Sequence, residues 1–420
     1  MASKDVLDKI HGSLLGLAIC DAIGTTVETL PPGSFEPITD MVGGGKFNVL
    51  PGQWTDDTSM ALCVAESVVE CQGYNPVDQL MRFCSWYVGW HFNCCGELID
   101  IGKTVRKSLE EFKKTATPYP GPTSERAAGN GSLMRLCPLP LAYASNPELA
   151  MELSARHSRT THGAQIAIDA CRYFAGILIG CIQGESKEKL LSENYSPIGL
   201  GYWQKHVPSP EVSKVAQGSY KTKEPPDIKA TGFVVDTLEA ALWGFYQTDT
   251  FKSGCLMVSN LGDDSDTVGA VYGQIAGAFY GTSGIPKEWR DRVYYRTLIE
   301  VLSGEIMCLS ERTKNANIPD DTNYEKVPCQ IEVLGAKYVQ MKIHGFTFLE
   351  EKSRELVRRL KPCPKQFKNL SEVDATISHI ESEYFKLEGV CPELFKDFKS
   401  MWLLEKEKLS LRIARKAYFN

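Results

Sequence analysis

The sequence lacks the features of several large protein classes. Its start has no charged segment followed by a long apolar stretch, so a secretory signal is not evident and we expect a cytoplasmic protein. The longest apolar run, residues 167–182, is interrupted by Asp169 and Arg172 and is too short for a membrane span, so we expect no membrane partner. The net charge of −6 gives no basic stripe for nucleic acid. A protein or small-molecule substrate is the expectation that remains.

Cysteine patterns for disulfides and zinc are also lacking. The chain has 14 cysteines in 420 residues, a length that can build its own core without disulfides. No Cys/His spacing supports zinc, and Cys94 and Cys95 are adjacent, without two residues between them as in a Cys-x-x-Cys pattern. Cysteines that stand within apolar helical patterns are therefore predicted to be reduced core residues, namely Cys63, Cys171, Cys181 and Cys255.

Strand-like alternation is scarce, whereas helical periodicity is frequent. Apolar residues recur at three- and four-residue intervals in the segments 59–70, 77–90, 163–181, 234–246, 268–280 and 288–302. Residues 1–308 are therefore predicted to form one all-α, multi-helix domain whose helices are joined by Gly/Pro-rich loops. Two of its helices carry a small residue at every fourth position, Gly12 to Gly24 and Gly269 to Gly281. Glycine costs about 1 kcal/mol per helix position relative to alanine, so these ridges predict close backbone packing.

Residues 309–420 differ in composition from the rest. They hold 20 basic and 17 acidic residues, which leaves a net charge of −9 on the first 308, and their glycines are fewer. We predict a C-terminal extension or small extra module that is mostly helical. Its charged last helix is typical of a solvated face, and its role is not readable from the sequence.

Two short acidic clusters are the most informative feature of the chain. Thr55-Asp56-Asp57-Thr58 and Asp264-Ser265-Asp266-Thr267 lie 207 residues apart, counted from Asp57 to Asp264, and each opens a helix-like run. Hard divalent cations prefer oxygen ligands, and distant clusters can share ions only if folding brings them together. The alternative is ordinary helix N-capping. A cap needs one side chain, however, and the surplus acids would repel one another without a counter-ion. The pair therefore predicts a two-metal site.

The segment between the first two predicted helices is long for a connection. Residues 28–54 contain four prolines and the run Gly43-Gly44-Gly45. Long loops without secondary structure in compact domains are usually lids or binding loops. We predict a flap over the acidic clusters.

The sequence resembles the ADP-ribosylglycohydrolase family, which includes dinitrogenase-reductase-activating enzymes and ADP-ribosylarginine and ADP-ribosylserine hydrolases. The resemblance covers roughly residues 8–305 and rests on seven motifs in the family's order. These are Gly16 to Gly24 with Asp21 and Glu28; Gln53 to Thr58; Asp100 to Gly102; Gly129 to Pro138; His157 with Thr161 and His162; Gly232 to Leu238; and Gly262 to Thr267.

The resemblance implies an α-helical fold with a binuclear Mg²⁺ or Mn²⁺ centre that cleaves the bond between C1″ of ADP-ribose and an acceptor side chain. The implied metal ligands are Thr55, Asp56, Asp57, Asp264, Asp266 and Thr267. Asp263 stands at a variable family position and is expected to be a neighbour. Asp21 is expected to orient a ligand or a water.

The implied catalytic residues are Glu28, Asp57 and Asp100. Glu28, on the predicted flap, is the candidate for proton transfer or for holding water, and without the motif it would be read as a surface glutamate. Asp100 stands in a segment similar to the arginine-specific branch, where a carboxylate can meet a guanidinium. The alternative for Asp100 is a helix cap from Ile101 onward. Asp236 has two readings: it could orient a ligand or a water, as expected of Asp21, or it could cap a helix.

The implied substrate-binding residues lie in three segments. Gly129, Asn130, Gly131 and Ser132 would offer backbone N–H groups to the diphosphate. His157 and His162 would line the ADP-ribose cleft, with structural roles as the alternative. Phe233 replaces a tyrosine that is frequent in the family, which removes a hydroxyl.

The sequence therefore predicts a Mg²⁺-dependent hydrolase of ADP-ribosylated protein side chains, with arginine preferred and ADP-ribose as product. One alternative is hydrolysis of ADP-ribosylserine or of another O-linked conjugate, including a small molecule. The alternative from a different class is an inactive ADP-ribose-binding or structural protein. Missing ligands would indicate the last, and none is missing. We expect a monomer.

Overall fold

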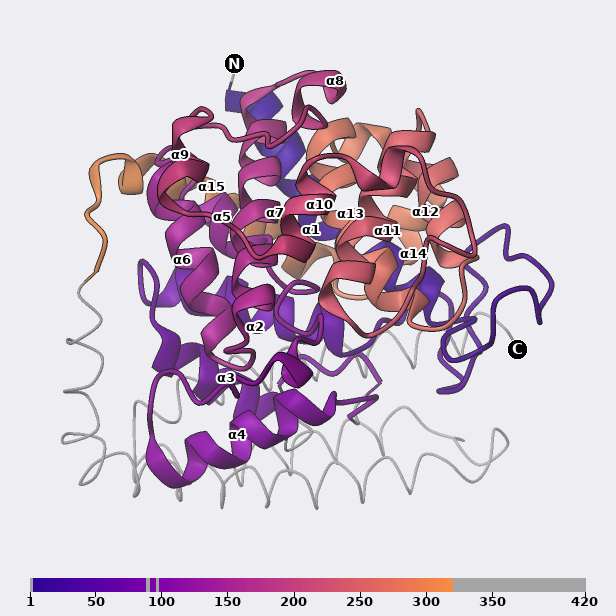
Figure 1. Cartoon of the computed structure of the whole chain (residues 1–420). Coiled ribbons are helices and arrows are strands. Elements are labelled where there is room, and N and C mark those ends of the chain that lie inside the picture. Colours follow the sequence, from indigo (N-terminus) through magenta and orange to yellow (C-terminus); the bar gives the residue numbers. More distant parts are fainter. Residues whose placement is uncertain (1–2, 88–90, 96–97, 320–420) are drawn as a thin grey trace, which may run out of the picture. The chain divides into compact units, whose positions relative to one another are not determined.

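The computed structural model describes residues 3–87, 91–95 and 98–319. These residues form helices joined by loops and contain no sheet (Figure 1). Strand pairing among them is limited to two isolated bridges, Gly44 with Val49 and Gly129 with Phe233. The all-α prediction is confirmed.

The longer helices are α1 (Ser3–Gly24), α2 (Asp56–Glu70), α3 (Pro76–Tyr87), α4 (Lys103–Thr115), α6 (Pro147–Arg159), α7 (Gln165–Gln183), α11 (Val234–Gln247), α12 (Phe251–Ser259), α13 (Ser265–Tyr280) and α15 (Arg296–Arg312). The shorter ones are α5 (Pro138–Ala142), α8 (Lys187–Leu190), α9 (Gly201–Lys205), α10 (Pro210–Ala216) and α14 (Lys287–Arg292). The described residues also contain four 3-10 turns: η1 (Glu125–Ala127), η2 (Ser219–Lys221), η3 (Thr282–Gly284) and η4 (Thr313–Asn315).

The two glycine ridges place α1 and α13 backbone against backbone. A Cβ added at Gly277 would lie 1.9 Å from the carbonyl oxygen of Gly12, and one at Gly273 would lie 2.1 Å from that of Gly16. The predicted close packing is confirmed. Because α1 carries Asp21 near its end and α13 carries Asp266 in its first turn, this contact fixes the separation of the two acids.

Gly273→Ala is expected to lower the free energy of unfolding by about 3 kcal/mol, because the added methyl meets backbone atoms that cannot move away. Gly304→Ala is the matched control. This glycine also lies within a helix, α15, but has open space around its Cβ position, so alanine there should stabilise by up to about 1 kcal/mol. Urea unfolding of both variants is the measurement. Equal effects would contradict the close packing.

The predicted helix at 288–302 is instead two helices, α14 and α15, and that prediction is wrong at residues 293–295. The break has a long-range cause. The amide of Tyr294 donates to the carbonyl of Gly52 at 2.9 Å, and its carbonyl accepts from the indole Nε1 of Trp54 at 3.1 Å. These bonds hold the segment that enters α2.

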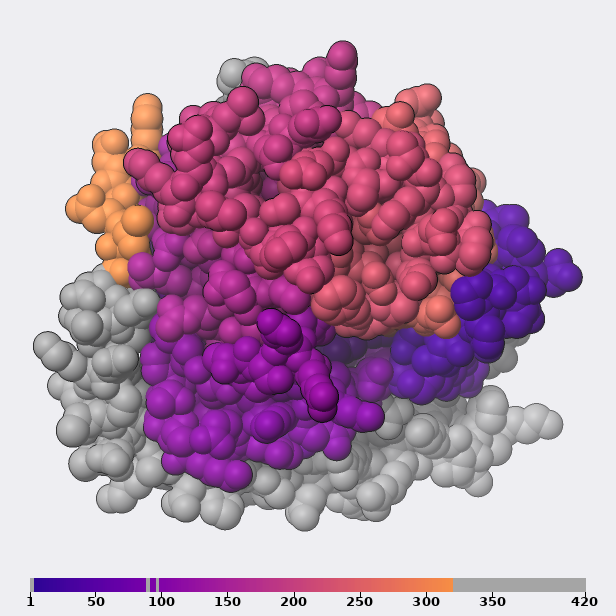
Figure 2. Space-filling model, in the orientation of Figure 1, coloured from indigo at the N-terminus to yellow at the C-terminus, as the bar shows by residue number. Residues whose placement is uncertain are grey.

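The connection between α1 and α2 forms the indigo edge on the right of Figures 1 and 2. It folds back on the end of α1. Gly45 has φ +65°, and a Cβ there would lie 2.2 Å from the carbonyl oxygen of Thr25, so only glycine fits this approach. Gly44 and Val49 exchange two backbone hydrogen bonds, of 2.7 and 3.0 Å, which close the tip of the loop.

The core cysteine prediction is confirmed, since Cys63, Cys171, Cys181 and Cys255 are free and buried. Among the described helices, α7 alone is long and apolar enough to cross a membrane, and 78% of that window is buried inside the protein. The α15 helix continues past residue 308 to Arg312. Residues 320–420 lie outside the described part of the chain, so the helical extension stays a prediction.

Candidate functional site

The first turns of α2 and α13 bring the two acidic clusters together. The hydroxyl Oγ1 of Thr55 lies 3.3 Å from Oδ2 of Asp57 and 3.4 Å from Oδ2 of Asp266, 211 residues further along the chain. All three side chains are buried. The juxtaposition that the two-metal hypothesis requires is therefore present.

The capping alternative does not account for these side chains. Thr55 stands at the N-cap position of α2 and Asp264 at that of α13, yet neither side chain accepts a capping hydrogen bond. The N-terminus of α2 is instead capped by a side chain from another helix. Oδ2 of Asp21 on α1 accepts from the amide of Thr58 at 3.0 Å and from its hydroxyl at 2.6 Å. The acidic side chains of the two clusters are therefore not needed as helix caps.

Asp21 also orients Thr55. Its Oδ1 accepts from the amide and from the hydroxyl of Thr55, each at 3.0 Å. Burial raises the pKa of Asp21 to about 6, and the hydrogen bonds from Thr58 and Thr55 oppose that shift. Asp21 thus lies behind the cluster, where the sequence reading expected it.

The site concentrates buried negative charge. Burial, reinforced by neighbouring carboxylates, raises the pKa of Asp56, Asp57 and Asp266 well above the usual range. Oδ1 of Asp57 is buried and has no hydrogen-bond partner. Among the described residues, no three Asp, Glu, His or Cys side chains are gathered about one point as a metal site. The oxygen-only donor set, its unmatched charge and the orphaned Asp57 oxygen nevertheless fit a hard divalent cation.

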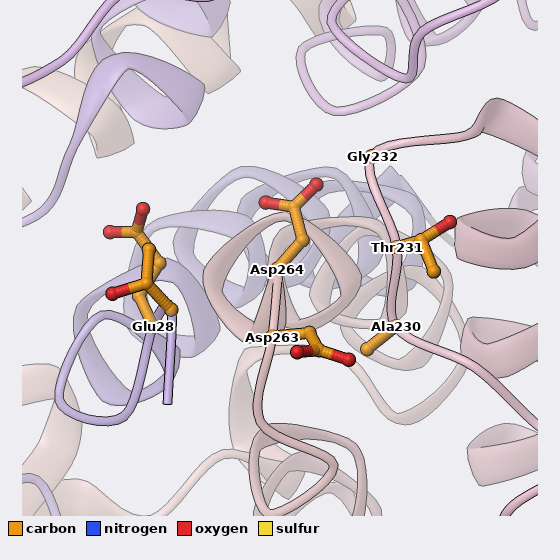
Figure 3. A pocket seen from close by; sticks show the side chains of 7 residues that line it. Glu28, Ala230, Thr231, Gly232, Asp263 and Asp264 are labelled. Carbon is orange, nitrogen blue, oxygen red and sulfur yellow. The ribbon is translucent and has the colours of Figure 1, made fainter. Parts of the chain in front are cut away.

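A pocket of about 250 Å³ opens over the clusters. Its acidic wall comes from Glu28, Asp56, Asp100, Asp264 and Asp266, with Thr267, and its other wall from Gly129, Asn130, Gly131, His162 and the start of α4. A wider hollow of about 460 Å³ adjoins it and shares Glu28, Gly232 and Asp264 (Figure 3). Residues from seven separate segments of the chain therefore converge on one space.

Glu28 is buried in the wall common to both spaces, so the reading as a surface glutamate is wrong. Its Oε1 lies 3.9 Å from Nζ of Lys46, while its Oε2 is buried and has no hydrogen-bond partner. Burial raises the pKa of Glu28 to about 7; Lys46 opposes this shift, and Asp100 and Asp264 add to it. A carboxyl group with this pKa can give or take a proton near neutral pH.

The backbone beside Glu28 is tied to the second acidic cluster. The amide of Thr29 donates to the carbonyl of Asp263 at 2.6 Å, and the amide of Asp263 donates to the carbonyl of Leu30 at 2.8 Å. In Figure 3 the carboxylate of Asp264 points towards the top of the view, whereas that of Asp263 lies well below it. This arrangement agrees with Asp263 as a neighbour and Asp264 as a candidate ligand.

Asp100 faces the pocket from the segment before α4. The helix begins at Lys103, and its N-cap residue is Gly102. Asp100 therefore does not cap the helix, and that alternative is wrong. Its carboxylate lies in the same pocket as Glu28 and Asp264.

Asn130 has a role that the sequence reading missed. Its amide Nδ2 donates to Oδ2 of Asp264 at 2.7 Å and to Oγ1 of Thr237 at 2.9 Å, and its backbone N–H donates to the carbonyl of Gly232 at 3.1 Å. The side chain thus orients a candidate ligand, while Gly129 and Gly131 line the pocket beside His162. An asparagine between two glycines was the available signal.

His157, which was predicted to line the cleft, lies in the core instead, and the side chain of Ser132 is buried there too, whereas the predicted contact of its backbone N–H with the diphosphate stays a prediction. His157 is fully buried, where Nδ1 lies 2.8 Å from Oε1 of Gln79, so its structural alternative is correct. The hydroxyl of Ser132 is buried against that of Ser158 at 2.9 Å. Both turn inward because they satisfy polar groups beneath the pocket wall.

The backbone of Phe233 forms an isolated β-bridge with Gly129, but its ring is not among the side chains that line the two spaces. Asp236 accepts from the hydroxyl of Thr231 at 2.6 Å, and it is not among the residues that line the two spaces. Lys46, which faces Glu28, was not predicted, and a lone lysine in a glycine-rich loop gives no signal of such a contact.

An all-α domain that buries two acidic clusters beneath a pocket, with a carboxyl group of near-neutral pKa in its wall, has the elements of a hydrolase of glycosyl bonds. Comparison with known proteins agrees. The family model ADP-ribosylglycohydrolase matches residues 2–316, and the chain belongs to this family of hydrolases.

Named relatives show the same affiliation. An ADP-ribosylarginine hydrolase of Serratia proteamaculans (strain 568) is 38% identical over 307 residues, which are 73% of this chain and 81% of that protein. The ADP-ribosyl-[dinitrogen reductase] glycohydrolase of Rhodospirillum rubrum is 30% identical over 297 residues, 70% of this chain and 92% of that protein. A solved structure described as an ADP-ribosylglycohydrolase-related protein complex has a TM-score of 0.64 and 40% identity, and covers 73% of this chain and 99% of its own.

Proposed function

We propose that this protein is a Mg²⁺-dependent hydrolase that releases ADP-ribose from modified arginine side chains of proteins, with Mn²⁺ able to replace Mg²⁺. The observation that carries the proposal is the shared hydroxyl of Thr55, which joins the two acidic clusters beneath a pocket that also contains Glu28 and Asp100. The Serratia and Rhodospirillum relatives support the substrate class.

The proposed metal ligands are Thr55, Asp56, Asp57, Asp264, Asp266 and Thr267. Two bound divalent ions would supply charge that holds ribose hydroxyls and lowers the pKa of a water. The chain itself orients these ligands, through Asp21 for Thr55 and through Asn130 for Asp264. A neutral amide donor on Asp264 restrains the carboxylate without removing its charge.

Glu28 is the proposed proton-transfer residue. Hydrolysis adds water to C1″, breaks the bond from C1″ to the arginine nitrogen and delivers a proton to the departing guanidine group. Burial is the largest cause that holds the pKa of Glu28 above its usual range, so this group can take the proton from water and return one near neutral pH. Burial of Oε2 without a partner leaves that oxygen for this role.

Asp100 is the proposed acceptor-side residue. Its carboxylate shares the pocket with Glu28, and a guanidinium can donate two parallel hydrogen bonds to such a group. This pairing favours arginine over serine as the modified residue.

The experiment that tests the proposal is release of ADP-ribose from peptides modified at arginine or at serine, with Mg²⁺, with Mn²⁺ and with a chelator. We expect release from the arginine peptide with either ion and none with the chelator. Release from serine alone would transfer the proposal to O-linked conjugates. Tight ADP-ribose binding without any release would favour the non-catalytic alternative.

A further inference from the structure

Arg135 is a fully buried cation beneath the glycine wall of the pocket. In the described part of the chain its hydrogen bonds go to neutral groups. Nη1 donates to the carbonyl of Gly131 at 2.6 Å, Nη2 to Oγ1 of Thr161 at 2.6 Å, and Nε to Nε2 of His157 at 3.3 Å. Its guanidinium carbon lies 4.5 Å from the centre of the Phe83 ring. Burying a charge is costly, so each of these acceptors has to be held in place.

The contact with His157 determines where that ring carries its proton. A guanidinium can only donate, so Nε2 of His157 is an unprotonated acceptor. The proton is then on Nδ1, which lies 2.8 Å from the acceptor Oε1 of Gln79. Burial, with Arg135 nearby, lowers the pKa of His157 well below its usual value, so the ring is neutral and has a defined tautomer.

The same reasoning extends through Thr161 to the pocket. Because Oγ1 of Thr161 accepts from Arg135, its own hydrogen has to find another acceptor. Among the described residues, that acceptor is Nδ1 of His162, at 2.9 Å. His162 then carries its proton on Nε2, the nitrogen that lies beside Gly129 and Gly131. Burial, with Arg135 nearby, lowers the pKa of His162 to about 3, so only a neutral N–H can donate from this ring.

We propose that Arg135 is a positioning residue that fixes, through Thr161, the tautomer of His162 so that its Nε2–H is donated to an anionic oxygen of the ADP-ribose diphosphate. The identity of the ligand rests on the proposed function. The same guanidinium holds the carbonyl of Gly131, so the glycine wall and His162 are set as one unit. A purely structural arginine would support the wall without controlling the proton.

Thr161→Val tests the relay. Valine has nearly the shape of threonine, so the packing is kept, but both the acceptor for Nη2 of Arg135 and the hydroxyl beside Nδ1 of His162 are removed. The tautomer of His162 is the readout that a merely structural role would not move. With histidine labelled in ¹⁵N in the full chain, NMR should show Nε2–H for His162 in the wild type and loss of that single tautomer in Thr161→Val. Affinity for ADP-ribose, measured by calorimetry, should fall about tenfold, the effect of losing one hydrogen bond to a charged group. Thr161→Ser should restore both readouts.

Thr160→Val is the matched control. Thr160 is equally buried and lies 3.4 Å from Nη2 of the same arginine, but it has no hydrogen bond to His162. It should leave the His162 signal as in the wild type. The proposal is overturned if wild-type His162 carries its proton on Nδ1, or if Thr161→Val changes neither the tautomer nor the affinity. If the wild type fails to bind ADP-ribose, both the proposed function and the proposed diphosphate ligand are wrong. The tautomer of His162 then tests by itself whether Arg135 acts through Thr161.

Discussion

Asp266→Asn is expected to lower the rate of ADP-ribose release from an arginine-linked peptide by on the order of a thousandfold in saturating Mg²⁺. The reason is charge. Asp266 is one of the buried carboxylates that meet at the hydroxyl of Thr55, and an amide cannot replace its negative charge in holding a divalent cation. Losing several kcal/mol of charge stabilisation corresponds to this factor.

The same substitution is expected to stabilise the chelator-treated protein. Burial, with Glu28 and Asp57 nearby, raises the pKa of Asp266 well above its usual value. A carboxyl group whose folded pKa is raised costs stability as the pH rises through that pKa, because the unfolded chain releases the proton more readily. The melting temperature of Asp266→Asn should therefore exceed that of the wild type at pH 8, and the difference should shrink towards pH 5.

Asp263→Asn is the control for both effects. It lies three residues before Asp266, is only half-buried, and in Figure 3 its carboxylate lies well below that of Asp264. Its activity and its melting temperature should stay close to those of the wild type. Full activity in Asp266→Asn would exclude Asp266 as a metal ligand.

Asp100→Asn is expected to lower kcat/KM for the arginine-linked peptide by about a hundredfold and to leave any slow release from a serine-linked peptide nearly unchanged. A carboxylate opposite a guanidinium makes charge-assisted hydrogen bonds that an amide cannot match, and two such bonds are worth about 3 kcal/mol. The serine-linked conjugate offers no guanidinium, so it reports on the rest of the site.

The serine-linked peptide is therefore the internal control for this variant. An equal loss with both peptides would show that Asp100 supports the site in general and does not select arginine. No loss with either peptide would remove Asp100 from the site. Asp100 lines the pocket two residues before the cap of α4, so its replacement should leave the helix intact.

The sequence predicted those parts of the fold and site that depend on local periodicity or on repeated chemistry. Gly12, Gly16, Gly273 and Gly277 predicted a close helix pair because their spacing leaves one face without side chains. The repeated acid and hydroxyl pattern predicted that residues 55–58 and 264–267 would meet. Glu28 was identified by family resemblance, since nothing in its local sequence indicates that a loop glutamate is buried.

The parts that were missed depend on contacts between distant residues. The helix predicted at 288–302 breaks because Tyr294 bonds to Gly52 and Trp54, and no property of the segment itself reveals this. Asn130 reaches Asp264 across 134 positions, and His157 turns inward because Arg135 needs an acceptor. Sequence patterns indicate which apolar residues are buried, whereas the burial and the partners of a polar side chain depend on the tertiary packing.

The measurement that tests the central claim most directly is electron paramagnetic resonance of Mn²⁺ bound to the chelator-treated protein and to Asp266→Asn. If residues of both acidic clusters hold two ions in one site, the wild type should bind two Mn²⁺ per chain and give a spin-coupled signal. Asp266→Asn should lose at least one ion and the coupling, while Asp263→Asn should keep both. A wild type that binds no Mn²⁺, or that gives only the signal of isolated ions, would contradict the shared site.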